Sequence, residues 1–168
     1  LPDHVENLIY TGWNSPFTGV GNSADNTIEG KQGNDILTGL GGNDTFTLAA
    51  GGSVASIDGG ADSDTIVGND GGNTFVVNAA NAGTANGVAF SGVENLTGGT
   101  AGDSFTFSAS LSGTASGGAE DDTFAINDGG SAGTIDGGTQ ATAAGDEVTY
   151  AGSTGPVTAS INGFTNIE

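Results

Sequence analysis

The sequence predicts an all-β fold: a parallel β-solenoid (β-roll or β-helix) of about eight or nine short coils, with no helix. Three observations lead to this prediction. A nine-residue frame recurs along the chain, glycine interrupts nearly every segment long enough for a helix, and short runs rich in Thr, Val, Ile and Phe alternate with Gly, Asn and Asp. Stacked coils would bury one continuous apolar core that no single coil could bury alone.

The nonapeptide frame is clearest in residues 21–47, which divide without gaps into GNSADNTIE, GKQGNDILT and GLGGNDTFT. Each copy opens with Gly, carries Asn26, Asp35 or Asp44 at its sixth place, and has one large apolar residue at its eighth place. Seven copies in one chain predict a repetitive architecture. The other four copies, which are irregularly spaced, are residues 59–67, 68–76, 98–106 and 117–125.

A longer repeat overlies the short one. Residues 42–60 align without gaps to residues 120–138, and the tetrapeptide VENL near the start of the chain returns at 93–96. We therefore predict two solenoid units, residues 1–92 with the nonapeptide run and residues 93–168, joined in one continuous rod. Because the chain begins and ends inside this pattern, we expect it to be a fragment of a longer or polymerising protein.

The secondary structure follows from the glycine spacing. The longest glycine-free run, residues 1–11, is no longer than an average helix of about 11 residues, and Gly inside a helix costs about 1 kcal/mol. Short strands are instead predicted in the segments DTFTL, NTFVV, DSFTF, DEVTY and PVTASI. The apolar residues expected to form the core ladder are Ile28, Leu37, Phe46, Ile57, Ile66, Phe75, Phe105, Phe124, Ile135 and Val148.

The charge of the chain excludes several classes of partner. Twenty acidic residues face Lys31 and no Arg, which gives a formal net charge of −19. Such a chain cannot neutralise nucleic-acid phosphates, and an anionic membrane surface would repel it. Its natural partners are cations, and its apolar runs are too short to insert into a bilayer. The absence of Cys excludes disulfide bonds but does not indicate a compartment.

The turn half of each nonapeptide carries oxygen donors. We expect the glycines at its first and fourth places to adopt positive φ and to point backbone carbonyls into the turn, where the sixth residue adds a carboxylate. Ca²⁺ takes about six to eight such hard oxygen ligands, at about 2.3–2.6 Å. One turn supplies about half of that number, so an ion is expected between two stacked turns.

The run GKQGNDILTGLGGNDTFT resembles the RTX, or haemolysin-type, calcium-binding nonapeptide G-G-x-G-x-D-x-U-x, where U is a large apolar residue, and is similar to repeats of bacterial surface adhesins. In that family two nonapeptides form one coil of a parallel β-roll, and each Ca²⁺ lies between turns two nonapeptides apart. The resemblance implies that Asp44 faces the turn of Asp25 and Asn26, while Asp35 faces the opposite side. Leu40 departs from the pattern by replacing its second glycine.

The candidate metal ligands are therefore turn residues. One or two Ca²⁺ ions are expected near Asp25, Asp35 and Asp44, with weak or empty turns later in the chain. The alternative for each Asp is a turn-forming role alone, because Asp and Asn side chains also bond to the local backbone. The complete set of candidates is Asp25, Asn26, Asp35, Asp44, Asp64, Asp103, Asp121, Asp122, Gly33 and Gly42.

Catalysis finds little support in the sequence. His4 is the only His, Lys31 is the only Lys, and neither Arg nor Cys is present, so nucleophile–base pairs and arginine-dependent sites are not available. Paired carboxylates could serve a glycosidase, but here the carboxylates recur at the turns of a repeat rather than in one cleft. We predict no enzymatic activity and no catalytic residue.

The predicted function is structural: a calcium-binding β-solenoid module of a secreted or cell-surface repetitive protein, such as an adhesin stalk, an S-layer or an extracellular filament. The resemblance implies a bacterial protein that is exported unfolded and folds outside the cell, where Ca²⁺ is abundant. Because open solenoid edges are adhesive, the expected partners are head-to-tail copies or further repeats of the same chain, with surface polysaccharide as another partner.

Two alternatives remain open at this point. One is a carbohydrate-associated module of an exported polysaccharide-modifying enzyme, although Tyr10, Trp13 and Tyr150 are few for an aromatic groove. The other is an ice- or mineral-binding face made of Thr. Thr27 and Thr45 could align on such a face, but Thr-x-Thr triplets do not recur in every coil.

Overall fold

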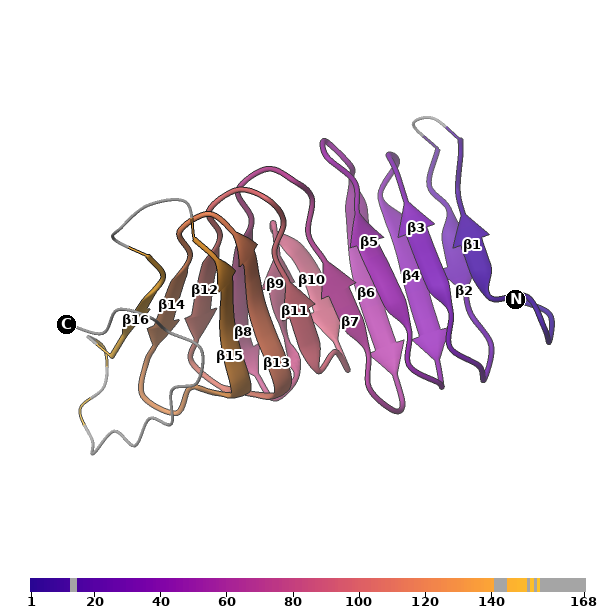
Figure 1. Ribbon diagram of the computed structural model, residues 1–168. Coiled ribbons are helices and arrows are strands. Elements are labelled where there is room, and N and C mark those ends of the chain that lie inside the picture. The colour runs from indigo at the N-terminus through magenta and orange to yellow at the C-terminus, as the bar shows by residue number, and fades with distance from the viewer. Residues whose placement is uncertain (13–14, 141–144, 151, 153, 155–168) are drawn as a thin grey trace.

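The computed structural model describes residues 1–12, 15–140, 145–150, 152 and 154 of the chain. These residues form a rod of two facing β-sheets, with the coils stacked from the N-terminal end at the right of Figure 1 to the C-terminal end at the left. Nowhere in these ranges is there a helix long and apolar enough to cross a membrane.

The two sheets are continuous along the rod. In spatial order, the first sheet consists of β1 (Asn7–Ile9), β3 (Thr27–Gly30), β5 (Thr45–Leu48), β7 (Thr65–Val67), β11 (Asn95–Thr97), β13 (Ser110–Ala119) and β15 (Ser131–Thr139). The second sheet consists of β16 (Glu147–Thr149), β14 (Thr123–Ile126), β12 (Ser104–Phe107), β8 (Thr74–Ala79), β9 (Ala82–Ala85), β10 (Val88–Ser91), β6 (Val54–Gly60), β4 (Asp35–Leu40) and β2 (Thr18–Val20).

The prediction of an all-β parallel solenoid is confirmed. The seven strands of the first sheet correspond to about seven turns, slightly fewer than the eight or nine predicted. The difference arises in part because residues 74–91 form three strands of the second sheet without adding a coil to the first. The predicted strand PVTASI and the side chain of Trp13 lie outside the described residues.

The core is the predicted ladder of apolar side chains between the sheets. Every residue of that ladder belongs to the core cluster or packs against it. The rings of Phe75, Phe105 and Phe124 stack with centroids 4.7 and 4.8 Å apart, because parallel pairing in register places equivalent residues one strand spacing apart. Each such buried side chain contributes about 1.5–3 kcal/mol.

Residues 74–91, here called the meander, break the parallel pattern. Strand β9 is antiparallel to both β8 and β10, whereas the other strand pairs of the described residues are parallel. β10 pairs with β6 and β8 pairs with β12, while β7 and β11 are direct neighbours in the first sheet. The second sheet therefore gains two strands at the middle of the rod that the first sheet lacks.

An outward-facing row on the first sheet contains threonines from successive coils. The register places Thr27 beside Thr45 and Thr45 beside Thr65, so the expected alignment of the first two is confirmed. In the parallel row two residues on, Thr47 lies between Glu29 and Val67. Only one of these three coils therefore presents a Thr-x-Thr triplet, and the ice- or mineral-binding alternative gains no support.

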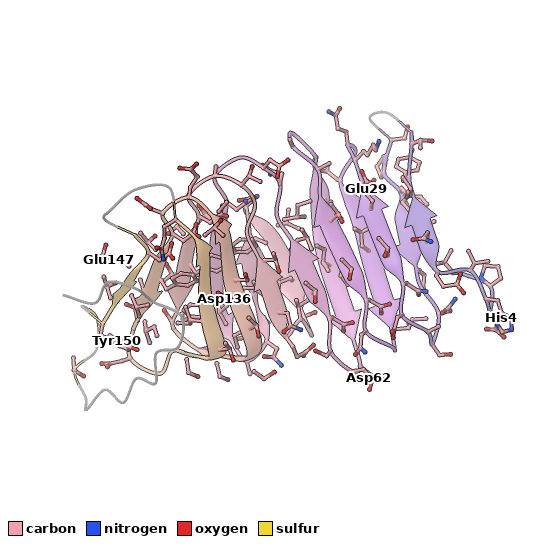
Figure 2. All side chains as sticks on the ribbon, in the orientation of Figure 1. His4, Glu29, Asp62, Asp136, Glu147 and Tyr150 are labelled. Carbon is pink, nitrogen blue, oxygen red and sulfur yellow. The ribbon has the colours of Figure 1, made fainter. Side chains whose placement is uncertain are left out.

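The turns lie along two edges of the rod. The first edge holds the turns that lead into the first sheet, including residues 21–26, 41–44, 61–64 and 92–94. Figure 2 shows Asp62 on this edge, at the bottom of the view, and Glu29 towards the opposite edge. That second edge holds the turns leading into the second sheet, including residues 31–34, 49–53, 68–73, 98–103 and 120–122.

Candidate metal centre

The glycine-rich turns bend through positive φ at the second and fourth places of the frame. Leu40 and Gly60 are at the second place, with φ of 86° and 110°, and Gly33 and Gly42 are at the fourth, with φ of 131° and 92°. The glycine at the first place, such as Gly39, does not have positive φ, so the prediction for that place was wrong. Its presence must have another cause.

Space is the reason for the glycine at the first place. A Cβ built on Gly39 would overlap Oδ2 of Asp44, in the same turn, and the carbonyl oxygen of Gly59, in the next coil. Both oxygens therefore face one small volume beside the Cα of Gly39. We call such a volume a glycine cradle and define it by the first-place glycine, the sixth-place side chain and the glycine carbonyl of the next coil.

Glycine cradles recur on both edges of the rod. Each has a side-chain oxygen and a carbonyl oxygen close to the Cα of a glycine. On the first edge, the cradle of Gly21 has the side-chain oxygen of Asn26 and the carbonyl oxygen of Gly39. The cradle of Gly39 has Asp44 and the carbonyl of Gly59, and the cradle of Gly59 has Asp64 and the carbonyl of Gly92. On the second edge, the cradle of Gly98 has the side chain of Asp103 and the carbonyl oxygen of Gly117, and the cradle of Gly117 has the side chain of Asp122 and the carbonyl oxygen of Gly137.

The sixth-place side chains also join consecutive coils on the first edge. Oδ1 of Asp44 accepts the N–H of Asn26 at 2.7 Å, and Oδ1 of Asp64 accepts the N–H of Asp44 at 2.8 Å. Glu94 continues the series, because its Oε2 accepts the N–H of Asp64 at 2.9 Å. The turn of Asp44 is thus stacked on the turn of Asp25 and Asn26, which is the arrangement that the resemblance implied.

A second series of hydrogen bonds runs along the second edge. The N–H of Asp103 donates to Oδ1 of Asp122 at 2.7 Å, and the N–H of Asp122 donates to Oδ1 of Asp146 at 2.9 Å. Asn73 begins this series, since both its N–H and its Nδ2 donate to Oδ1 of Asp103. The carboxylate series therefore extends well beyond the clear nonapeptide run at residues 21–47.

Three of these carboxylates have an oxygen atom without a partner. The Oδ2 atoms of Asp44, Asp64 and Asp122 are buried and accept no hydrogen bond, and all three residues are 0% exposed. Each Oδ2 lies in its cradle near a carbonyl oxygen, which cannot donate a hydrogen bond. A buried acceptor without a donor costs about 1–3 kcal/mol, and more when it is charged. These cradles therefore call for a cation or a proton.

Protonation of these carboxyl groups is shifted in the direction that burial predicts. Burial, and to a smaller extent the charges of Asp44, Glu94 and Asp62, raise the pKa of Asp64 to about 6, although the N–H of Asp44 opposes the shift. Burial and neighbouring aspartates likewise raise the pKa of Asp122 to about 6. Burial also raises the pKa of Asp44. In each case the backbone N–H that the carboxylate accepts offsets only part of the cost of burying its charge.

The donors of a cradle fit a calcium ion. Carboxylate and carbonyl oxygens are both hard ligands, and Ca²⁺ binds such atoms at about 2.3–2.6 Å. Within the described part of the chain, no three His, Asp or Glu side chains gather closely enough to hold a metal ion. Backbone carbonyls and water would therefore have to complete the coordination, so that two stacked turns share one ion.

Asp35 lies on the second edge and has a different environment. Its Oδ1 accepts the N–H of Phe17 at 3.0 Å, and its Oδ2 accepts the N–H of Lys31 at 3.1 Å. Gly30 is the first-place glycine of this turn. Its neighbour from the next coil is a methyl group of Val54, whereas the glycine cradles have a carbonyl oxygen there. Both oxygens of Asp35 thus have partners in the protein, and its geometry favours the turn-forming role.

Two further predicted residues, Asp25 and Asn26, belong to the turn under Asp44. Asp25 is exposed, and its Oδ1 accepts the N–H of Asn43 at 2.7 Å. Asn26 is buried, and its Oδ1 accepts the N–H of Asn22 at 2.8 Å. Asn26 thus brings a neutral oxygen to its cradle.

The remaining predicted residues lie at closely packed turns. Asp103 is fully hydrogen-bonded, because its Oδ2 accepts the N–H of Gly99 at 2.7 Å. Asp121 is half-buried and adjoins the cradle of Gly117 through the residue that follows it. A Cβ on Gly33 or Gly42 would overlap the backbone of the turn beneath, so these two glycines allow the turns to stack closely.

Three kinds of residue in these turns were not among the predicted ligands: the first-place glycines that border the cradles, Glu94 and Asp146. A signal for the last two exists. Asp146 directly precedes the strand segment Glu-Val-Thr, and Glu94 directly precedes Asn-Leu-Thr, just as Asp44 precedes Thr-Phe-Thr. The nine-residue frame does not find them because the spacing before each is irregular.

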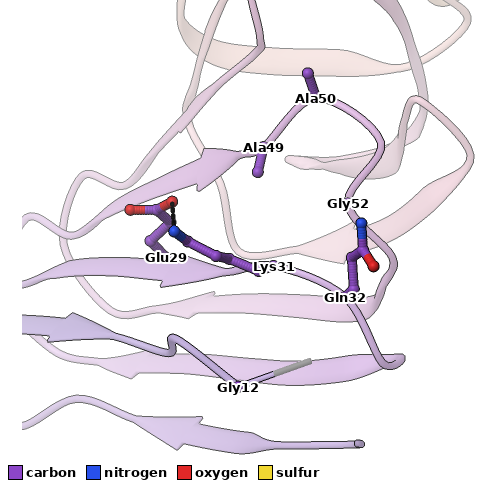
Figure 3. A pocket seen from close by; sticks show the side chains of 7 residues that line it. All are labelled: Gly12, Glu29, Lys31, Gln32, Ala49, Ala50 and Gly52. Carbon is purple, nitrogen blue, oxygen red and sulfur yellow. Dashed lines mark ion pairs between the residues drawn. The ribbon is translucent and has the colours of Figure 1, made fainter. Parts of the chain in front are cut away.

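A shallow hollow of about 270 Å³ lies elsewhere, around Lys31 on the second edge (Figure 3). Nζ of Lys31 lies 4.0 Å from Oε1 of Glu29, and both side chains are partly exposed. The described residues that line the hollow include no aromatic side chain, the feature expected in the groove of a carbohydrate-associated module.

Comparison with protein families identifies the repeats. Residues 20–54 and 56–81 match the RTX calcium-binding nonapeptide repeat (4 copies), so the predicted resemblance is confirmed for residues 21–47 and for the two copies of the frame at 59–76. Repeats of this kind bind Ca²⁺, the ion predicted from the donor set. The match includes the cradles of Asp44 and Asp64, while those of Asp103 and Asp122 lie outside it. No curated protein and no solved structure was found to match the chain.

Proposed function

We propose that this chain, which carries RTX calcium-binding repeats at residues 20–54 and 56–81, is a calcium-stabilised structural module of a secreted or cell-surface repetitive protein. One observation carries the proposal: the buried Oδ2 of Asp44 has no partner and faces the carbonyl oxygen of Gly59 across the cradle of Gly39. The same arrangement recurs at Asp64. Repeat solenoids of this family are structural.

In this proposal each carboxylate joins two coils by different atoms. Oδ1 of Asp44 accepts the N–H of Asn26, in the preceding coil. Oδ2 of Asp44 and the carbonyl oxygen of Gly59, in the following coil, would hold Ca²⁺. The ion would supply the positive charge that the buried carboxylate lacks.

The net charge explains why calcium would control folding. With a formal charge of −19, the chain repels itself, and stacking coils brings the buried carboxylates of successive turns closer together. At low Ca²⁺ we expect the folded state to be only weakly stable, and at high Ca²⁺ we expect it to be strongly favoured over the expanded chain. RTX repeats are typical of secreted bacterial proteins, and such a response supports an extracellular location, where Ca²⁺ is abundant.

Head-to-tail stacking into a filament belongs to the same proposal, in the setting of an adhesin stalk, an S-layer or an extracellular fibre. Strands β1 and β2 end the two sheets at one end of the described rod, and the apolar side chains of Ile9 and Val20 are exposed there. Unpaired strand edges with apolar side chains favour pairing with another edge. Negative-stain microscopy in Ca²⁺ should show filaments, and isolated monomers would contradict this part of the proposal.

Circular dichroism tests the calcium dependence. Far-UV spectra recorded a few degrees above the melting temperature in EDTA should change from an unfolded to a β spectrum during a titration with Ca²⁺, and EDTA should reverse the change. The same titration with Mg²⁺ is the control, because Mg²⁺ prefers to keep its water ligands. A β spectrum that is the same in Ca²⁺ and in EDTA would contradict the proposal while leaving the solenoid fold unaffected.

A further inference from the structure

We infer that one calcium ion holds together the two ends of the meander, residues 74–91. Oδ2 of Asp64 binds the ion from the repeat before the meander, and the carbonyl oxygen of Gly92 binds it from the turn after the meander. Glu94 lies beside the ion. This inference rests on the proposed function, since it uses the same ion. It goes further by giving one site a specific task, which is to join the two halves of the rod.

The donors of this site converge at Gly59. A Cβ built on Gly59 would lie 2.6 Å from Oδ2 of Asp64 and would overlap the carbonyl oxygen of Gly92. Asp64 is completely buried, and its Oδ2 accepts no hydrogen bond. Gly92 itself has a φ of 60°, a conformation that favours glycine, so the turn that presents this carbonyl is built around a glycine.

The connectivity of this cradle distinguishes it from the preceding one. At Gly39, the carbonyl oxygen comes from Gly59, which is one coil further along the chain. At Gly59, it comes from Gly92, and the whole meander lies between the two glycines in sequence. An ion in the cradle of Gly59 would therefore hold together the two ends of the segment that contains β8, β9 and β10.

Glu94 connects this cradle to the meander. Its Oε2 accepts the N–H of Asp64 at 2.9 Å, and its Oε1 accepts Nδ2 of Asn81, in the turn between β8 and β9, at 2.8 Å. Asn81 is held from both sides, since its carbonyl oxygen accepts the N–H of Val93 and its Oδ1 accepts the N–H of Ser112. Glu94 thus bonds both to the turn of Asp64 and to the turn between β8 and β9.

The carboxylates of Asp62, Asp64 and Glu94 approach one another here without a positively charged side chain to offset them. Glu94 and Asp62 both repel negative charge on Asp64, and the one Lys of the chain lies on the other edge. Without a cation, this repulsion opposes the contact between the turns of Asp64 and Glu94. With Ca²⁺ the contact is stabilised, and the meander is held against the coil on each side.

Hydrogen–deuterium exchange of the intact chain with and without Ca²⁺ tests the inference. In the unmodified chain, Ca²⁺ should slow exchange at least about tenfold both at residues 39–48, which include the cradle of Asp44, and at the meander. Asp64→Asn should lose the effect at the meander and keep it at residues 39–48. This variant should fold, because Asn occupies the equivalent place at Asn26 and Asn73.

Two further variants sharpen the test. Glu94→Gln, which keeps the hydrogen-bond acceptor and removes the charge, should weaken the calcium effect at the meander. Asp70→Asn removes an exposed charge from the turn before the meander and should change nothing. The inference is overturned if Asp64→Asn retains full calcium protection at the meander, or if the unmodified chain is protected at residues 39–48 alone. Absence of protection at both places would overturn the proposed function as well.

Discussion

The sixth residue of each repeat turn uses its two side-chain atoms differently. One oxygen joins coils by accepting a backbone N–H, as Oδ1 of Asp44 does, and this task needs no charge. An amide oxygen could accept the same N–H, although the neutral Asn26 and Asn73, at the same place, use Oδ1 within their own turns, for the N–H of Asn22 and of Asn69. The negative charge at Asp44 and Asp64 therefore requires a separate explanation, and a cation in the glycine cradle provides it.

Replacing Asp44 by Asn separates the two tasks. Asn can still accept the N–H of Asn26, and its amide can donate to the carbonyl oxygen of Gly59, so in EDTA we expect Asp44→Asn to be at least as stable as the unmodified chain. In saturating Ca²⁺ the variant should be less stable, by about 1–3 kcal/mol, because a ligand is missing. Thermal unfolding in both solutions measures this. A variant that is destabilised equally in EDTA and in Ca²⁺ would indicate that Asp44 only shapes the turn.

A methyl group added at Gly39 tests whether the cradle must be left free of a side chain. Gly39→Ala should abolish calcium binding at this site, because its Cβ would occupy the volume between Oδ2 of Asp44 and the carbonyl oxygen of Gly59. Gly41→Ala, in the same turn, is the matched control, since a Cβ there meets only Oδ2 of Asp62, at 4.0 Å. Calorimetry should find one ion fewer for Gly39→Ala alone. An equal stoichiometry for both variants would argue against the cradle.

Sequence could predict which residues matter here but not what each atom does. Asp35 and Asp44 have the same place in the frame, yet only Asp44 has an oxygen without a partner. The difference comes from the second-place residue of each turn. Lys31 donates its N–H to Oδ2 of Asp35, whereas Oδ2 of Asp44 accepts no hydrogen bond and Leu40, at the second place of its turn, has a φ of 86°. The backbone conformation at that place depends on how the coils stack, which one nonapeptide cannot reveal.

At the scale of the strand, stability depends on the ladder of apolar side chains. Phe105→Ala should lower the free energy of unfolding by about 3–5 kcal/mol, because it leaves a cavity between the stacked rings of Phe75 and Phe124. Ile36→Ala is the comparison, since Ile36 is 46% exposed and should lose about 0.5 kcal/mol. Urea unfolding in saturating Ca²⁺ gives both values. Similar losses would contradict the assignment of the core.

Strand β4 ends on a strained residue. Leu40 has a φ of 86° and an exposed side chain, so it bears the cost of a left-handed conformation and gains little from burial. Leu40→Gly should therefore raise stability by about 1 kcal/mol, measured as a higher urea midpoint. Leu40→Ala keeps the Cβ and should gain less. If both variants behaved alike, loss of the exposed side chain rather than relief of strain would explain the change.

The sequence predicted the regular strands and missed the meander. Alternating apolar residues and glycine-rich turns indicate β5, β8 and β12 because these strands have one buried face. The meander had one clear signal, the dipeptide Asn86-Gly87, whose residues have φ of 51° and 81° and which favours a tight hairpin. The long strand β13 contains three glycines and has no local signal, because its extended backbone is imposed by pairing with β11 and β15.

Across the whole molecule, buried carboxylates without a positively charged partner make the stability of the fold depend on both pH and calcium. The folded pKa values of Asp64 and Asp122, about 6, are above the ordinary 3.8. The folded state therefore holds protons that the unfolded chain releases between about pH 4 and 6. This contribution to stability is fully present below about pH 4 and is lost as the pH rises through about 6.

Melting temperatures should consequently respond to pH in opposite ways with and without the ion. In EDTA, we expect the melting temperature to fall as the pH rises from 5 to 7.5. The increase produced by Ca²⁺ should be larger at pH 7.5 than at pH 5, because protons compete with the ion for the same oxygens. A melting temperature in EDTA that rises across this interval would contradict the raised pKa values, because it would mean that the ionised carboxylates are stabilised by the fold.

The central claim is that calcium lies in the glycine cradles, between a sixth-place carboxylate and the glycine carbonyl of the next coil. X-ray diffraction from crystals grown in Ca²⁺, with anomalous scattering to identify the ion, tests it most directly. We predict anomalous peaks within coordination distance of Oδ2 of Asp44 and Oδ2 of Asp64, and none at Asp35. Peaks confined to the outer tips of the turns, with both cradles empty at saturating Ca²⁺, would contradict the account.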